Sequence, residues 1–248
     1  FASVVSRDRE TDTVYYWYKG IEVDSLKFTL KHNTLTKSYD YRIRKAEPDS
    51  LKVTVVQNGT LQLVDTVKIR TNTPLKDFDV DAISLLDKDS VSVPFKLAQN
   101  NKHELQMLFD VFPNENYQLQ LLPGAITDFF DVTHDTLAVK LNTKSRVDYG
   151  NLSLRLGNVP SFPIFIDLLD EKEEIKRSVY ATEPRGVFRF AYLRPTKYYI
   201  RVRIDENANG KWDTGHYLKK QKPEAVYHFE SQLDVRANWE LQEQFILK

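Results

Sequence analysis

Oxygen-bearing side chains recur at alternate positions in one short stretch, and their spacing is typical of a calcium-binding loop. Carboxylates and amides occupy its first, third, fifth and ninth positions: Asp205, Asn207, Asn209 and Asp213. Gly210 at the sixth position permits a sharp turn, and Lys211 at the seventh would offer its backbone carbonyl. Calcium prefers oxygen ligands, so the pattern predicts an ion that orders the loop and takes no part in catalysis.

Two features of the same stretch favour an ordinary hairpin loop without a metal. Calcium loops place a bidentate glutamate at position twelve, where this chain has His216, and only Asp205 and Asp213 would be charged ligands. Asn209-Gly210 is also a strong turn pair, and Asp and Asn fill such loops with or without a metal. We therefore expect no cofactor, with a structural Ca2+ ion in this loop as the alternative.

A second stretch with binding potential is a run of four aromatic residues, Tyr15, Tyr16, Trp17 and Tyr18. In a strand, Tyr15 and Trp17 face one way and Tyr16 and Tyr18 face the other. One interpretation is a platform for a sugar or a peptide. We favour the other, in which one face is core and the second is covered by a neighbouring domain, because exposed apolar patches are uncommon on monomers.

Motifs for catalysis are missing from the sequence. The chain has no cysteine and only 8 glycines, and it contains neither a Gly-x-Ser-x-Gly elbow nor a glycine-rich phosphate loop. His216, Glu224 and His228 would form an acid–base or metal site only if the fold brought them together, because their spacing matches no known metal motif. We expect a protein that is not an enzyme.

Composition limits the partners. Lys plus Arg equals Asp plus Glu at 35 each in 248 residues, so no basic excess predicts binding to nucleic acid or to anionic lipid. No apolar run approaches the roughly 20 residues of a membrane helix. The sequence opens at Phe1 and not at Met. This fits a mature protein or a cut portion from which a leader or a lipid anchor has been removed.

Alternating strand patterns separated by turn residues recur along the chain, which is typical of β-sandwiches. Residues 163–169 read as a near-continuous apolar strand. Residues 198–204 alternate, with Ile200 and Val202 on one face and Arg201 and Arg203 on the other. The predicted fold class is all-β with tandem sandwiches. Residues 1–60 are expected to be leading strands that end or extend an Ig-like domain, followed by sandwiches over 61–147 and 148–248.

Several segments carry a resemblance to a known family: 122–128 (LPGAITD), 148–152 (DYGNL), 205–215 (DENANGKWDTG) and 236–239 (RANW). They resemble the C-terminal portion of Ig-like-domain lipoproteins of the Bacteroidota cell envelope. The first segment is similar to the end of an S-layer-type Ig-like domain. The last two are similar to a closing domain of the transthyretin type, also called prealbumin-like or carboxypeptidase-regulatory-like. The resemblance implies an envelope location, an upstream lipoprotein signal and no catalytic activity.

These observations predict a non-catalytic scaffold or interaction module, in the periplasm or at the cell surface and associated with the outer membrane. Its partner would be a protein or a glycan of the envelope, and contact with the membrane would run only through an upstream lipid anchor. The alternative is a carbohydrate-binding or accessory module of a surface glycan-uptake system, which would use Tyr15–Tyr18.

Overall fold

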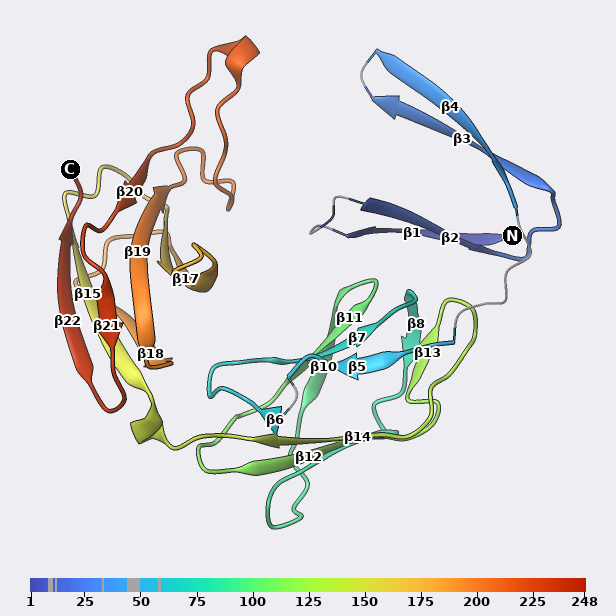
Figure 1. The fold of residues 1–248 in the computed structure, drawn as a ribbon, viewed down its shortest axis with the longest axis horizontal. Helices are drawn as coiled ribbons and strands as arrows, with labels where there is room; N and C mark the ends of the chain where they lie inside the picture. The colour runs from blue at the N-terminus through green and yellow to red at the C-terminus, as the bar shows by residue number, and fades with distance from the viewer. Residues whose placement is uncertain (9–10, 12, 33, 44–49, 58) are drawn as a thin grey trace. The chain divides into compact units, whose positions relative to one another are not determined.

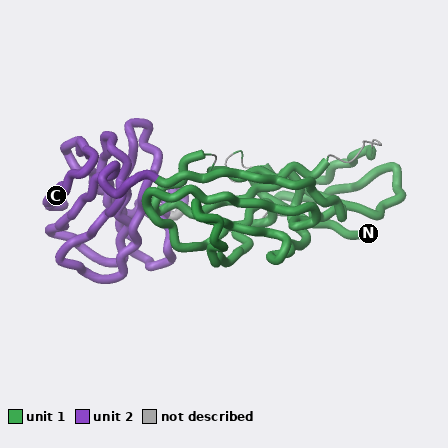
Figure 2. Tube along the Cα trace, turned by 90° about the horizontal axis from the view of Figure 1, so that it is seen from below, with its two compact units in different colours: residues 1–143 green, residues 144–248 purple. Residues whose placement is uncertain are grey.

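A computed structural model describes residues 1–8, 11, 13–32, 34–43, 50–57 and 59–248, and two compact units divide the chain (Figure 2). The first spans Phe1–Thr143 and the second Lys144–Lys248. Among the described residues, the only helical elements are two three-residue 3-10 turns, Arg146–Asp148 and Tyr217–Lys219. The predicted all-β class is confirmed. No described helix has the length and hydropathy that a bilayer crossing requires.

The first unit begins with two separate hairpins, drawn in blue in Figure 1. Strands β1 (Ala2–Asp8) and β2 (Thr13–Lys19) form one two-stranded sheet. Strands β3 (Ser25–His32) and β4 (Leu35–Arg42) form the other. Neither hairpin shares a sheet with a third strand among the described residues.

The rest of the first unit is a sandwich of two four-stranded sheets. One has the order β10-β11-β7-β5, from Lys96–Asn101, Glu104–Leu108, Val67–Thr71 and Val53–Val55. The other has the order β6-β14-β12-β9, from Gly59–Thr60, Leu137–Asn142, Asn116–Leu121 and Ile83–Leu86. A short pair joins β8 (Leu75–Phe78) to β13 (Ile126–Asp128).

The sandwich of the first unit starts before residue 61. Leu51 and Leu61 are buried in the same apolar core as Ile69 and Leu119. Strands β5 and β6, which the sequence placed among the leading residues, pair with β7 and β14. The leading strands outside the sandwich are therefore the two hairpins, and the chain divides at residues 143 and 144, just before the predicted boundary at 147 and 148.

The second unit also has two sheets around one core. Three strands form the first, in the order β18-β15-β22, from Phe188–Leu193, Gly150–Gly157 and Glu240–Ile246. The second has the order β17-β16-β19-β20, from Ile175–Ala181, Ile164–Leu169, Thr196–Ile204 and Val226–His228. Strand β21 (Leu233–Val235) also pairs with β19, and β15 and β22 run parallel.

Strict alternation in β16 and β19 fills that core. Ile164, Ile166 and Leu168 of β16 point inward with Ile200 and Val202 of β19, and all five are essentially buried. Apolar area removed from water contributes roughly 25 cal/mol per Å2, so these alternating positions stabilise the second unit. The outward positions of the same two strands carry Asp167, Arg201 and Arg203.

Gly150 stands where β15 passes very close to another stretch of backbone. A Cβ atom there would lie 2.6 Å from the carbonyl oxygen of Arg236 and 2.6 Å from Cγ1 of Val235. Backbone cannot yield as a side chain does, so we expect Gly150→Ala to lower the free energy of unfolding by about 1–3 kcal/mol. Urea unfolding measures the change. Gly186→Ala is the control, because no atom lies within 4 Å of the added carbon; equal stabilities would refute the close approach.

Candidate functional site

The predicted calcium loop directly follows β19, and its first residue anchors it. Asp205 is fully buried, and its N–H donates to the carbonyl of Pro163 at 3.0 Å. Its Oδ1 accepts the N–H of Asn209 at 3.1 Å, and its Oδ2 accepts the N–H of Gly210 at 2.9 Å. The Asp205 carboxylate thus stabilises the turn by accepting two of its backbone N–H groups. Gly210 permits the turn because it adopts a positive φ of 74°.

The remaining side chains of the motif bond to one another across the loop. Oδ1 of Asn207 accepts the N–H of Asn209 at 3.0 Å, and Oδ1 of Asn209 accepts the N–H of Lys211 at 2.8 Å. Oδ2 of Asp213 accepts the side-chain amides of Asn207 at 2.6 Å and Asn209 at 2.7 Å. The fold therefore brings together the four side chains that the spacing singled out.

Two residues outside the motif also hold the loop: Tyr180, which the sequence analysis did not single out, and Glu224, which it considered only for a different site. Glu224 is buried, and its carboxylate accepts the N–H of Glu206 at 2.9 Å and that of Asp213 at 2.8 Å. Tyr180, on β17, donates its hydroxyl to Oδ2 of Asp205 at 2.8 Å. Both depend on tertiary pairing, because Glu224 follows Asp213 by 11 positions and Tyr180 precedes Asp205 by 25.

The oxygen-rich loop suits a hard cation in the type of its ligands. Within the described part of the chain, however, no group of three or more His, Asp or Glu side chains is arranged to hold a metal. Hydrogen bonds link all four side chains of the motif within the loop. Calcium binding stays a prediction, tested by following the thermal midpoint in calcium and in EDTA. A rise with calcium that Asp213→Asn removes would support it, and equal midpoints would refute it.

The hydroxyl of Tyr180 offers a direct probe of the buried Asp205 carboxylate. Its hydrogen bond to the Asp205 carboxylate, and secondly desolvation, raise the pKa of Tyr180 above 10.0. A raised pKa favours the protonated tyrosine in the fold, so this contribution is present below pH 10 and is lost as the pH rises through the folded pKa. Carbon-13 NMR of labelled tyrosines, assigned with Tyr180→Phe, should show late titration; a midpoint like that of an unfolded peptide would contradict the bond.

The four aromatic residues divide between two faces of β2. On one face, Trp17 donates its indole N–H to Oγ of Ser6 at 2.8 Å, and its ring lies 5.6 Å from His103 and 6.2 Å from Phe130. Ser6 Oγ also lies 2.9 Å from Nε2 of His103. Since His103 and Phe130 belong to the sandwich region, this face packs against the sandwich of the first unit.

The opposite face of β2 meets the second hairpin. Tyr16 and Tyr18 stack with ring centroids 6.0 Å apart, and Phe28 of β3 meets Tyr16 edge-on at 5.2 Å. Tyr15, beside Trp17, stays exposed. The structure does not bring the four rings onto one patch, which counts against a continuous aromatic platform for a sugar.

An ion pair also ties the first hairpin to the sandwich. Lys19 and Lys76 both donate to the carboxylate of Asp131. Their hydrogen bonds lower the pKa of Asp131 to about 2. The carboxylate therefore remains charged, and the tie remains formed, well into the acid range.

The proposed trio of His216, Glu224 and His228 does not assemble. Glu224 is used by the loop, while His228 on β20 pairs with Arg201 of β19. His216 lies in a backbone bridge to Gln221. The described residues thus hold no converging acid–base set at these three positions.

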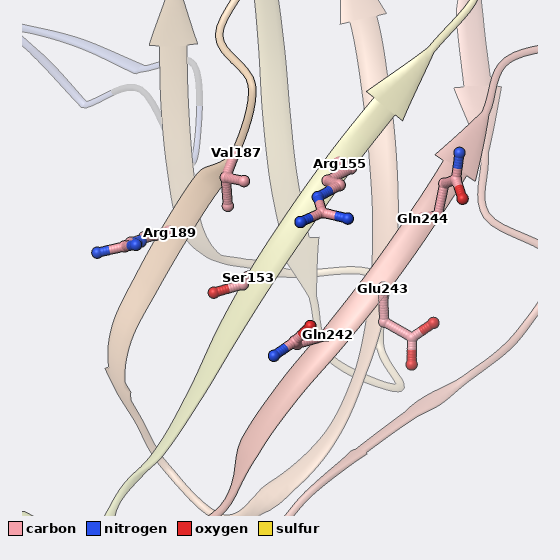
Figure 3. A pocket seen from close by; sticks show the side chains of 7 residues that line it. All are labelled: Ser153, Arg155, Val187, Arg189, Gln242, Glu243 and Gln244. Carbon is pink, nitrogen blue, oxygen red and sulfur yellow. The ribbon is translucent and has the colours of Figure 1, made fainter.

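A shallow polar depression of about 350 Å3 lies on the outer face of the sheet β18-β15-β22 (Figure 3). Its lining comprises Ser153, Arg155, Val187, Arg189, Gln242, Glu243 and Gln244. Figure 3 shows these side chains spread along three neighbouring strands. None of the residues that line the depression is a buried acid or nucleophile.

No protein-family model matches the chain. No curated protein matches it in sequence either. The family suggested by the resemblance therefore stays a prediction.

The chain is distantly similar to several solved structures. One is native alpha-2-macroglobulin from Escherichia coli, at 11% identity over 73% of this chain and 71% of that one, with a TM-score of 0.32. Another is the major pilin subunit of Bacillus cereus, at 10% identity, 98% and 81% coverage, and a TM-score of 0.26. A third is an L,D-transpeptidase from Mycobacterium tuberculosis, at 11% identity, 62% and 75% coverage, and a TM-score of 0.29. These values are too low to transfer a fold or a function, so the architecture rests on the strands described above.

Proposed function

We propose that the chain is a non-catalytic scaffold or interaction module of the bacterial cell envelope. The observation that carries this proposal is the amphipathic hairpin β3–β4. Leu26 pairs with Tyr41 and Phe28 with Tyr39 on one face, whereas Lys27 pairs with Asp40 on the other. Directly paired residues share a face in an antiparallel sheet, so the hairpin has one mainly apolar side, on which Lys37 lies opposite Leu30, and one polar side.

The apolar side of this hairpin is largely uncovered. Leu30, Leu35, Tyr39 and Tyr41 are each more than half exposed, and Phe28 alone is seen to contact an aromatic ring of the first hairpin among the described residues. A two-stranded hairpin is at best marginally stable by itself, and a contiguous exposed apolar patch marks an interaction site. The hairpin is therefore the surface on which a partner is expected.

The net charge of the β3–β4 hairpin and its unpaired strand edges indicate which kind of partner would fit. The two strands carry four cations, namely Lys27, Lys31, Lys37 and Arg42, against the single carboxylate of Asp40. The outer edge of each strand is unpaired among the described residues, so a partner strand could bond to the backbone there. The partner that fits is an extended protein segment in which apolar and acidic residues alternate. A second copy would bring the same positive charge and be repelled.

Two synthetic peptides test this function: one alternates valine with glutamate and the other alternates valine with lysine. We expect the full chain to bind the acidic peptide preferentially, less tightly at high salt, and weakly when Lys27→Glu and Lys31→Glu are combined. Lys172→Glu in the second unit is the control charge reversal. Equal binding of both peptides, or self-association in sedimentation that the hairpin variant abolishes, would refute this partner.

The glycan-binding alternative is tested in the same assay with neutral oligosaccharides. If they bound and Tyr15→Ala removed that binding, the exposed ring of Tyr15 would be the binding site instead of the β3–β4 hairpin.

A further inference from the structure

A carboxylate without exposed surface lies on the outer face of the sheet in the second unit. Asp167 of β16 accepts the Nε of Arg203 at 2.7 Å and its Nη2 at 3.2 Å. The same carboxylate accepts the Nε and Nη2 of Arg201 at 3.2 and 3.1 Å, and the hydroxyl of Ser178 at 2.8 Å. Three neighbouring strands thus supply one hydrogen-bonded cluster around Asp167.

This cluster fixes both arginines but balances only one of them. Each guanidinium uses its Nε and Nη2 on Asp167, and no described residue bonds to either Nη1. Their side chains are only 20% and 18% exposed, so the uncompensated positive charge is held partly out of water. Partial burial of an unbalanced charge is unfavourable unless an anion joins it. A rigid guanidinium with one free edge is well suited to accept a planar carboxylate.

Aromatic rings flank the two arginines on the same face. Tyr199, Arg201 and Arg203 are alternate residues of β19 and point outward together. The guanidinium of Arg203 lies 4.9 Å from the ring centre of Phe165, which in turn is 4.7 Å from that of Tyr180. Tyr180 and Tyr199 are both exposed. Tyr199, Arg201 and Arg203 therefore form a row along β19, which Tyr180 extends from two strands away, beyond Phe165.

We propose that this row, made of Tyr199, Arg201, Arg203 and Tyr180, is a binding site for an acidic polysaccharide whose sugars carry carboxylates. The free guanidinium edges would bind the uronate carboxylates, and the tyrosine rings would pack on the apolar faces of neighbouring sugars. This site lies in the second unit and does not depend on the hairpin surface of the first. Asp167 is a positioning residue, since it orients the arginines and does not touch the ligand.

The test uses the full chain and a galacturonic acid tetramer, measured by calorimetry at constant ionic strength. Arg201→Gln and Arg203→Gln should each weaken binding at least tenfold. Arg155→Gln and Arg189→Gln are matched controls, because these arginines lie on the outer face of the other sheet and form no ion pair seen among the described residues (Figure 3). They should leave binding unchanged.

Other ligands and one further variant, measured in the same assay, identify what the site recognises. A neutral galactose tetramer should not bind, and sodium acetate should compete only at far higher concentration. Tyr199→Ala should also reduce affinity while leaving the Asp167 cluster in place, which keeps the test valid if an arginine variant fails to fold. Absence of uronate binding, equal losses in the control variants, or equal binding of a glutamate tetramer would overturn the proposal.

Discussion

Replacing Asp205 with alanine should lower the free energy of unfolding by about 2–4 kcal/mol, the largest effect we expect in the candidate loop. Two donors would lose their acceptor at once, the N–H of Gly210 and the hydroxyl of Tyr180, while the N–H of Asn209 would keep only Oδ1 of Asn207. A buried donor left without a partner costs about 1–3 kcal/mol, and water can reach these donors because only Asp205 itself is fully buried, which reduces the sum. Urea unfolding of the second unit, followed by the fluorescence of Trp212 and Trp239, measures the loss.

A neighbouring carboxylate provides the control for this change. Asp213 lies at the other end of the loop, is not fully buried, and accepts only side-chain amides through its carboxylate. Asp213→Ala should therefore lower the stability by less than about 1 kcal/mol. Similar losses for the two variants would show that Asp205 does not anchor the loop.

Removing the carboxylate of Asp167 should have a comparably large effect, about 3–5 kcal/mol for Asp167→Ala. Breaking a buried ion pair is costly because the remaining charge is left uncompensated, and here two guanidinium groups would face each other without their shared anion. Chemical denaturation reports the change.

Asp234→Ala is a matched control, since that carboxylate also takes the Nε and Nη2 of an arginine, Arg236, at 2.9 and 2.8 Å. Both partners of this second pair are more than half exposed, so its loss should change stability by about 1 kcal/mol or less. Equal losses in Asp167→Ala and Asp234→Ala would mean that burial does not strengthen the Asp167 cluster.

Periodicity in the sequence predicted much of the second unit. The alternation of Ile200 and Val202 with Arg201 and Arg203 correctly assigned the two faces of β19, because side-chain direction in a strand follows from position alone. The same reasoning missed Asp167, which stands inside a run that reads as continuously apolar. Its role appears only when β16 is paired with β19, and pairing register is not a local property.

The candidate loop shows the same division between local and tertiary information. Its Asx-type turns follow from Asp205, Asn207 and Asn209 at fixed offsets, so spacing was enough to group them. Glu224 and Tyr180 reach the loop through tertiary folding, and the spacing of the motif gives no sign of either contact. In the first unit, the alternation at Tyr16 and Trp17 predicted two aromatic faces, but which surface each would meet depended on long-range contacts.

The parallel pairing of β15 with β22 has a consequence for how the polypeptide matures on the ribosome. Asn151 bonds to Glu240 across 89 positions, and this contact closes the sheet β18-β15-β22. During synthesis, β15 cannot pair with β22 until the end of the second unit has been made. By then the first sandwich, whose strands all lie before residue 143, has already emerged. Long-range pairings form slowly and leave edges open in the interval. The second unit is thus the one that most needs protection from aggregation while the chain is incomplete.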